Sequence, residues 1–384
     1  MSDQPFVANT FLEGDNAEVM PTLESESFDL VYADPPYNTG NAFAWNDRYG
    51  GHEDWVAFMR PRLEQAHRLL APTGALWLSI DDHEMAHLWL LLAEVFGEEN
   101  LLAQLVVSLN PKGRQLGGGF ATTHEYLLVA AKDASRCVLD ATSPDTVDPA
   151  DFPLTTHDGR AYRHLPLRNT NKKFNPATAP TLHYPLWGDP GSGRVAVGAF
   201  DGATEVWPVF GDGTPAVWRW SPGKVTAQPD DVVCRAIRGR AGERVDVFQR
   251  DWLHRETPDG SVQRRKKLRT IWTSAEVGST DTAIAELKAL LGHVFDNPKP
   301  TGLLLRILGT MPPDVRVLDF FAGSGTTGHA VVLANTADGG RRTCVSINAP
   351  EPTRPDSRAA RAGYETVSSI TAARLRAVGP LLEP

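Results

Sequence analysis

Hydrophobic and polar residues alternate near both ends of the chain in a pattern that predicts short buried strands separated by amphipathic helices. Residues 28–33 (FDLVYA) form an apolar run that stops at Asp34, which predicts a buried strand. Apolar residues recur at helical spacing over 55–70. Toward the C-terminus the pattern returns, with a strand predicted at 315–321 and a helix from Thr326. Strands that alternate with helices favour a doubly wound, mostly parallel α/β sheet.

The middle of the chain has a different texture. Glycine, proline, asparagine and tryptophan interrupt any periodicity between about Pro144 and Pro229. A length of 384 residues allows two domains, or one large domain that carries an insertion. We therefore expect one half of an α/β core in residues 1–135, an insertion in 136–270, and the other half of the core in 271–384.

The composition is that of a globular protein, with 41% hydrophobic and 22% charged residues. The first ten residues lack the features of a signal peptide, and no apolar stretch is long enough to span a bilayer. The three cysteines form no CxxC pair, so neither a disulfide framework nor a zinc site is expected. We expect a cytoplasmic protein with no membrane association.

The charge is distributed unevenly. The whole chain has a net charge of −9, which by itself disfavours a protein that coats nucleic acid. Residues 1–110 hold 4 basic and 18 acidic residues, a net of −14, whereas 111–270 hold 23 and 18, a net of +5. The insertion therefore lies in the part of the chain best suited to contact phosphates.

A glycine-rich segment follows the predicted strand at 315–321. Gly323, Gly325 and Gly328 stand where a strand turns into a helix, which predicts close approach of the backbone to a nucleotide-like cofactor. The same spacing fits the dinucleotide fingerprint, so a nicotinamide-dependent dehydrogenase is one interpretation. Asp319 argues against it, because a carboxylate would face the pyrophosphate. It suits a cofactor with a cationic or amino-acid group.

A second motif, Asp34-Pro35-Pro36-Tyr37, follows the strand at 28–33. Residues at the carboxyl edge of an open α/β sheet face the ligand crevice. The proline pair removes two N–H donors and leaves a rigid cluster of acceptors beside an aromatic ring. This arrangement suits an exocyclic amino group, whose N–H groups Asp34 and the Pro35 carbonyl can accept while Tyr37 stacks on the base.

The chain resembles the β-group of S-adenosylmethionine-dependent DNA amino-methyltransferases, and especially the modification subunits of type III restriction systems. The blocks that carry the resemblance are DPPYNTGNAF, SIDDHE followed by EVFGEEN, HEYLLVAAKD, WRWS, VFDNPKP and LDFFAGSGTTGHAV, in the order of the family. The resemblance implies a Rossmann-like methyltransferase fold with an inserted target-recognition region. It implies transfer of a methyl group to the amino group of a flipped base. The Asp of DPPY favours N6 of adenine, and N4 of cytosine is the alternative.

The resemblance also implies roles for individual residues. Asp34, Pro35, Pro36 and Tyr37 would form the catalytic amino-group site. The S-adenosylmethionine site would comprise Asp15, Asn16, Asp34, Asn297, Lys299, Asp319, Phe321, Gly323, Gly325, Thr326 and Glu351. The expected partners are double-stranded DNA, a second copy of the chain and a restriction subunit. A non-catalytic DNA-binding subunit with the same fold is the remaining rival.

Two further patterns need interpretation. His83-Glu84-x-x-His87 fits the zincin motif, but no third ligand is apparent and the segment lies within a block of the family, so we expect no metal. Basic residues in the insertion and beside a run of glycines are expected to contact DNA phosphates, namely Lys112, Arg114, Arg264, Arg265, Lys266 and Lys267. Trp218 and Trp220 either stack on DNA or pack in a core.

Overall fold

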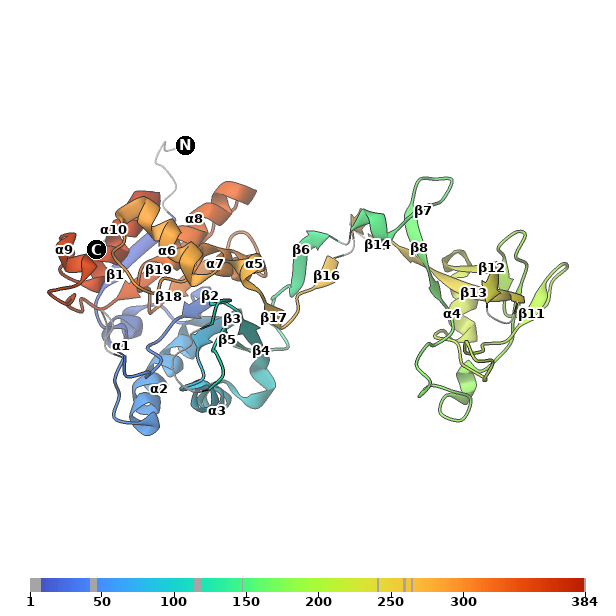
Figure 1. Cartoon of the computed structure of the whole chain (residues 1–384), viewed down its shortest axis with the longest axis horizontal. Helices are drawn as coiled ribbons and strands as arrows, with labels where there is room; N and C mark the ends of the chain where they lie inside the picture. Colours follow the sequence, from blue (N-terminus) through green and yellow to red (C-terminus); the bar gives the residue numbers. More distant parts are fainter. Residues whose placement is uncertain are drawn as a thin grey trace. The chain divides into compact units, whose positions relative to one another are not determined.

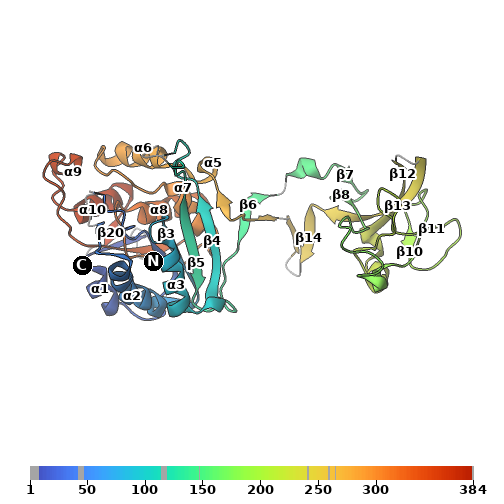
Figure 2. The same ribbon diagram turned by 60° about the horizontal axis from the view of Figure 1, so that its bottom comes forward.

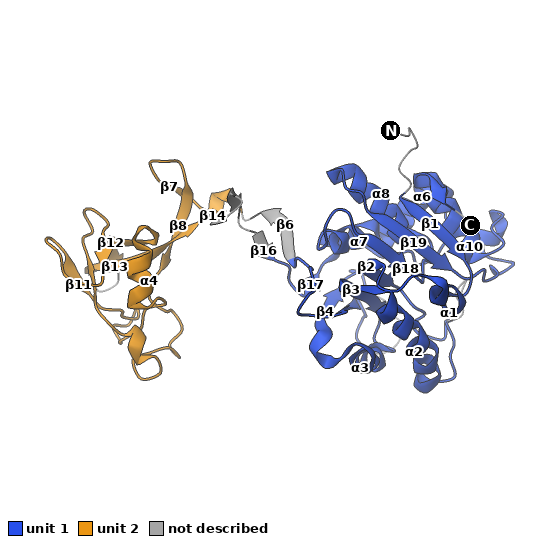
Figure 3. Ribbon diagram, turned by 180° about the vertical axis from the view of Figure 1, so that it is seen from behind, with its two compact units in different colours: residues 1–142, 267–384 blue, residues 143–266 orange. Residues whose placement is uncertain are grey.

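The computed structural model describes residues 8–41, 47–113, 119–146, 148–239, 242–257, 260–263 and 265–382. The chain divides into two compact units (Figure 3). Unit 1 comprises residues 1–142 and 267–384, and unit 2 comprises residues 143–266. The sequence predicts an insertion over 136–270, and the separate unit begins a few residues later and ends a few residues earlier.

Unit 1 is built on a nine-stranded sheet. In spatial order the strands are β17 (Ile271–Trp272), β4 (Leu101–Val107), β5 (Glu125–Ala131), β3 (Leu70–Ile80), β2 (Phe28–Ala33), β18 (Arg316–Asp319), β19 (Thr343–Asn348), β1 (Asn9–Glu13) and β20 (Leu381–Leu382). Strand β5 runs antiparallel to β3 and β4, and the other neighbours pair in parallel. The predicted mostly parallel α/β sheet is therefore confirmed.

Helices cover both faces of this sheet (Figures 1 and 2). One face carries α1 (Asn16–Val19), α2 (His52–Leu69) and α3 (Met85–Phe96), and the other carries α5 (Ser274–Val277), α6 (Thr280–Leu291), α7 (Thr301–Leu308) and α8 (Thr326–Asp338). The short α9 (Arg358–Arg361) and α10 (Val367–Val378) complete unit 1. Among the described residues, no helix is both long and apolar enough to cross a membrane.

Strand β2 shows why this layering follows from the sequence. Successive side chains of a strand point to opposite faces of the sheet. Leu30 and Tyr32 pack in the core that α7 and α8 cover, whereas Val31 and Ala33 pack in the core that α2 and α3 cover. A strand that is buried on both faces needs a continuous apolar run, which residues 30–33 (LVYA) provide after Asp29.

Unit 2 contains two small antiparallel sheets. One has the order β12 (Val232–Gly239), β13 (Gly242–Trp252), β8 (Ala161–Pro166), β7 (Leu154–Thr155), and the other has the order β10 (Val195–Ala196), β9 (Leu186–Gly188), β11 (Thr204–Val206). Further elements are α4 (Pro222–Ala227) and the pair β14 (His254–Thr257) and β15 (Gly260–Gln263), and the pair β6 (Thr142–Thr146) and β16 (Arg265–Lys267) lies where the chain passes from one unit to the other. Trp218 and Trp220 are buried in the core, and the indole of Trp218 donates to the Tyr184 carbonyl at 2.8 Å, so the two tryptophans serve packing.

Candidate active site

The two motif-bearing strands of unit 1 are direct neighbours. Strands β2 and β18 pair in parallel, with Asp319 opposite Tyr32. Their carboxyl ends therefore open on the same edge of the sheet, where a cavity of about 700 Å³ lies. The predicted site residues that line it are Asp15, Asn16, Asp34, Pro35, Pro36, Tyr37, Asn297, Lys299, Asp319, Phe321, Gly323, Thr326 and Glu351. Gly325 does not line the cavity; it immediately precedes α8.

The glycines of the loop between β18 and α8 have distinct tasks. Gly323 and Gly325 have φ angles of 51° and 76°, in the left-handed region that side chains disfavour. Gly328 lies inside α8, where an added Cβ would come within 2.4 Å of the Leu375 side chain and 2.7 Å of Asn9 Oδ1. The first two glycines therefore shape the turn, and the third permits close packing of α8 against α10 and β1.

Asp319, the last residue of β18, is a buried carboxylate beside this loop, with 2% of its surface exposed. It accepts hydrogen bonds from Thr327 Oγ1 at 2.5 Å and from the Phe321 backbone N–H at 3.1 Å. Burial raises the pKa of Asp319 to about 7, in spite of these hydrogen bonds. A cationic ligand group beside Asp319 would favour its ionised form, so the site suits a positively charged ligand.

A buried arginine organises the adjacent end of β1. Arg62 of α2 donates from Nε to Asn16 Oδ1 at 2.5 Å and from a terminal nitrogen to Asp15 Oδ1 at 3.0 Å. Asn16 in turn donates to the Phe320 carbonyl at 2.7 Å. This arginine joins two residues of the expected cofactor site to α2. Sequence reasoning missed Arg62, because it stands in the middle of a helix and belongs to no motif.

A charged network surrounds the Asp34 carboxylate. Lys299 Nζ lies 3.0 Å from Asp34 Oδ1 and 2.9 Å from Glu125 Oε2, and it donates to the Tyr37 hydroxyl at 2.8 Å. The hydroxyl lies within hydrogen-bond reach of both carboxylates, at 2.7 Å from Asp34 and 3.0 Å from Glu125. The resemblance assigned Lys299 to the cofactor site, and the structure pairs it with the DPPY residues. Glu125 was missed, although it lies in the block HEYLLVAAKD.

Burial and pairing act in opposite directions on these groups. Burial raises the pKa of Asp34, and the positive charge of Lys299 opposes that rise. Burial alone would lower the pKa of Lys299, but the charges of Asp34 and Glu125 outweigh it and raise that pKa above its usual range. Burial also raises the pKa of Tyr37, so its hydroxyl stays neutral. The network therefore holds one cation between two acidic groups, with a single phenolic hydrogen to share between them.

The backbone of the DPPY loop is held from several sides. Trp55 Nε1 of α2 donates to the Pro36 carbonyl at 2.8 Å, which leaves the Pro35 carbonyl as the proline acceptor for a ligand. Asn38 has a positive φ of 60°, and its backbone N–H donates to Asp47 Oδ1 at 3.0 Å. The side chain of Asn38 donates to Glu84 Oε1 at 2.7 Å. These contacts fix the acceptors relative to α2 and α3.

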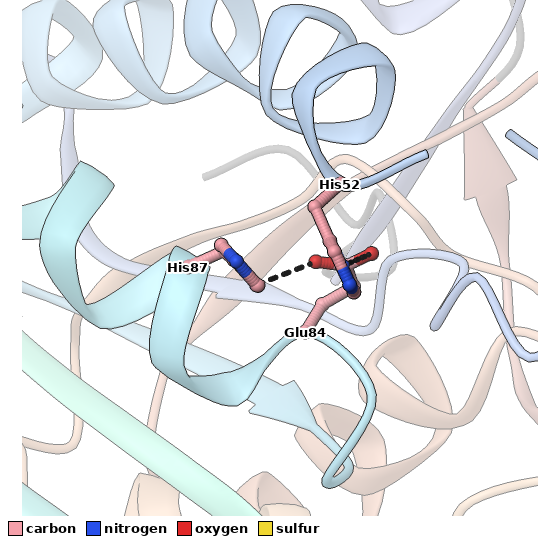
Figure 4. A group of neighbouring side chains, drawn as sticks. All are labelled: His52, Glu84 and His87. Carbon is pink, nitrogen blue, oxygen red and sulfur yellow. Dashed lines mark hydrogen bonds and ion pairs between the residues drawn. The ribbon is translucent and has the colours of Figure 1, made fainter. Parts of the chain in front are cut away.

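The zincin arrangement is not formed. His83 Nδ1 lies 3.0 Å from both oxygens of Asp81, and His83 stands apart from the group of His52, Glu84 and His87 that the fold brings together (Figure 4). The sequence motif therefore does not describe the actual neighbours of Glu84.

The predicted DNA contacts are only partly described. Lys112 is exposed and pairs with Asp281 Oδ2 at 2.9 Å. Lys267 is exposed as well. Arg114 and Arg264 lie outside the described residues, as do the side chains of Arg265 and Lys266.

A buried carboxylate at the end of β18, the glycine-rich loop that follows it and an acceptor cluster after β2 define a methyltransferase-type α/β protein with an inserted unit. Residues 28–337 match the N6_N4_Mtase family, described as DNA methylase, and the chain belongs to this family. It is 33% identical over 380 residues to the type II methyltransferase M.KpnI of Klebsiella pneumoniae, covering 95% of this chain and 86% of the relative.

Two further proteins that the chain is similar to are a longer relative and a solved structure. The chain is 32% identical over 411 residues to the EcoPI Mod subunit of a type III restriction-modification enzyme from Escherichia phage P1, with 96% of this chain but only 62% of the relative covered. Among solved structures, the cytosine-N4-specific PvuII DNA methyltransferase aligns over 98% of this chain and 95% of its own, with 13% identity and a TM-score of 0.45.

Proposed function

We propose that this DNA methyltransferase transfers a methyl group from S-adenosylmethionine to N6 of adenine in double-stranded DNA. The observation that carries the proposal is that Asp34 and Asp319, at the ends of neighbouring parallel strands, line the same cavity. One carboxylate lies in an acceptor cluster suited to an amino group, and the other is a buried acid suited to a cation. The cavity volume of about 700 Å³ is within the usual range for small-molecule sites.

The cofactor, when bound, supplies a methyl group on a positively charged sulfur. Asp319 would face the cationic amino-acid part of the cofactor, Gly323 would let the backbone approach it, and Asp15 and Asn16 would be held in place by Arg62. Glu351 would bind the ribose hydroxyls, as acidic residues do in dinucleotide sites. Asn297, Phe321 and Thr326 also line the cavity and would complete the cofactor site.

The catalytic residues act on the amino group of the target base. Asp34 and the Pro35 carbonyl would accept its two N–H bonds, which directs the nitrogen lone pair at the methyl carbon. The bound cofactor would supply the methyl group and leave as a neutral thioether, and the proton that the nitrogen loses would pass to solvent. Asp34 stabilises the positive charge that develops on nitrogen, and fixed acceptors of this kind supply a large share of catalysis.

Lys299 and Glu125 set the charge of this site. Lys299 opposes the effect of burial on the pKa of Asp34 and so favours its ionised form, and the same ammonium also pairs with Glu125. Tyr37 would stack on the flipped base through its ring while its hydroxyl remains anchored in the network. Stacking and hydrogen bonds offset the few kcal/mol that flipping costs.

Unit 2 is proposed to select the DNA sequence. Its support is the position of the insertion in the chain and the local excess of basic residues over 111–270. The Mod subunit relative supports a restriction subunit as partner, and we extend the proposal to a homodimer and to a cytoplasmic location, where chromosomal DNA is accessible. Sizing of the purified protein with and without DNA tests the dimer.

The test uses unmethylated genomic DNA and isotopically labelled S-adenosylmethionine, with the methylated nucleoside identified by mass spectrometry. N6-methyladenine is the expected product. N4-methylcytosine would replace the adenine assignment, and recovery of neither would overturn the proposal. The Asp34→Ala variant should bind the cofactor in calorimetry but transfer no label, which separates catalysis from binding.

A further inference from the structure

We propose that His52, Glu84 and His87 form a binding site for a zinc-type divalent cation behind the DPPY loop. His52 is the first residue of α2, Glu84 directly precedes α3, and His87 lies in the first turn of α3. Figure 4 shows the Glu84 carboxylate next to both imidazole rings. Two imidazole nitrogens and one carboxylate form the protein ligand set typical of zinc sites that keep an open position.

The donor atoms are close enough to converge on one ion. His52 Nδ1 lies 2.9 Å from Glu84 Oε1, His87 Nδ1 lies 3.1 Å from Glu84 Oε2, and one ligand atom from each residue lies within 4.8 Å of the others. A tetrahedral zinc ion with bonds of about 2.0–2.1 Å holds its donors about 3.3 Å apart, so no separation between donors must shrink by more than about 1.5 Å.

A small rearrangement supplies that change. The two rings are stacked, with centroids 4.1 Å apart and an interplanar angle of 17°, so one ring must turn before both lone pairs meet at one ion. The side chain of His52 is 60% exposed and has room to turn. The 40% exposure of His87 leaves space for a water molecule in an open coordination position.

Unsatisfied buried atoms point to a missing ligand. Glu84 is fully buried, and its Oε1 accepts from Asn38 and contacts His52. Its Oε2 and His87 Nδ1 are buried atoms with no hydrogen bond from any residue in the described ranges, although they lie 3.1 Å apart. An unsatisfied buried polar atom costs about 1–3 kcal/mol, and more when it is charged. A cation bound to both atoms would remove that cost.

This inference departs from the expectation of no metal. That expectation concerned the zincin pair of His83 and His87, in which Glu84 would act as a base. In the structure Glu84 is a potential ligand, His83 is excluded, and the second histidine comes from α2. The hydrogen bond from Asn38 to Glu84 joins the site to the DPPY loop, so a bound ion would brace the backbone next to the catalytic acceptors.

The experiment uses the full-length chain without a histidine tag, stripped of metal, in the absence of S-adenosylmethionine and DNA. Equilibrium dialysis against Zn²⁺ should give one ion per chain, and Co²⁺ should give the visible absorption of a four-coordinate site. The His52→Gln and His87→Gln variants should each bind Zn²⁺ at least about tenfold more weakly, since loss of even an outer partner usually costs 10–100-fold.

The matched control is His83→Gln, which removes a neighbouring histidine outside the group and should leave Zn²⁺ affinity unchanged. Thermal melting of the metal-free variants confirms that they fold. The proposal is overturned if no stoichiometric ion binds, if His87→Gln binds as wild type does, or if His83→Gln weakens binding as much as the others. Because no methyl transfer is measured, the outcome is independent of the proposed function.

Discussion

Replacing Lys299 by methionine tests the charge balance of the DPPY site. The side chain of Lys299 is 10% exposed, and its ammonium contacts Asp34, Glu125 and the Tyr37 hydroxyl at 2.8–3.0 Å. Methionine has a similar length but no charge. It would leave two carboxylates beside one phenolic hydrogen, with no cation between them. We expect one carboxylate to take up a proton, which lowers the fraction of Asp34 able to accept the amino group.

The size of the effect follows from the contacts. Two unit charges 3 Å apart at an effective dielectric constant of about 20 interact by about 5–6 kcal/mol, and removal of one partner of a buried pair typically costs about 3–5 kcal/mol. The side chains of Asp34 and Glu125 are 25% and 24% exposed, so water screens part of the charge interaction. We therefore use the lower end of the range of about 3–5 kcal/mol. Losing about 3 kcal/mol of stabilisation raises the pKa of Asp34, because it increases the proton affinity of the carboxylate about 100-fold.

The sign of the pH dependence is fixed by that rise. A carboxyl group with a raised pKa is ionised only at higher pH, so activity that needs the ionised form is present above the new pKa and lost below it. Single-turnover methylation by Lys299→Met should be slower than wild type at low pH and should recover as the pH rises, with the loss approaching about 100-fold only at a pH below the pKa of Asp34 in both proteins. The double variant Lys299→Met with Glu125→Gln removes the repelling charge and should return the pH profile toward that of the wild type.

Two outcomes would contradict this reasoning. Lys299→Met could keep the wild-type pH profile, in which case the lysine does not control the ionisation of Asp34. Alternatively, calorimetry could show a large loss of S-adenosylmethionine affinity with a normal rate at saturation, which would return Lys299 to the cofactor role that the resemblance implies. A melting curve of each variant verifies folding.

Three further predictions test other parts of the chain. Burial raises the pKa of Asp319 to about 7, so the affinity for S-adenosylmethionine should be greatest above pH 7 and about tenfold weaker at pH 6 than at pH 8. In calorimetry the Asp319→Asn variant should bind S-adenosylmethionine weakly at every pH. If its affinity changes with pH as much as that of the wild type, Asp319 is not the source of the pH dependence. The Gly328→Ala variant should have a lower midpoint of urea unfolding, because the added Cβ would come within 2.4 Å of the Leu375 side chain and overpacking costs about 1–3 kcal/mol. The control is Gly223→Ala, whose added Cβ would meet no atom within 4 Å. Equal unfolding midpoints for the two variants would contradict the packing argument. Trp218→Ala should cost about 3–5 kcal/mol within unit 2 and abolish DNA binding in a mobility-shift assay while cofactor binding persists, whereas unchanged DNA affinity would argue against unit 2 as the recognition part.

Much of the secondary structure could be predicted from local patterns. The strand at 28–33 has the expected bounds, and a helix begins at Thr326 as expected. Burial on both faces requires an apolar run, and the turn before α8 requires positive φ angles at Gly323 and Gly325, so both features are encoded in adjacent residues. The residues of the loops after β2 and β18 could likewise be singled out from two short motifs, DPPY and the glycine-rich segment.

The contacts that set charge were not encoded locally. Glu125 meets Tyr37 across 88 residues of chain, and Lys299 meets the same hydroxyl across 262. Arg62 reaches Asp15 from a helix with no motif of its own, and His52 joins Glu84 from a helix terminus. No spacing pattern could indicate these pairs.

By itself the sequence determined the alternation of strands and helices, because burial and backbone conformation depend on neighbouring residues. It also determined the two motifs at the strand ends, and with them the family to which the chain belongs. Only the tertiary structure decided which charged side chains share the edge of the sheet where the cavity lies. That choice depends on strand order: β2 lies between β3 and β18, and β5 lies next to β3. Strand order minimises the free energy of the whole core, so no segment of the chain specifies it alone.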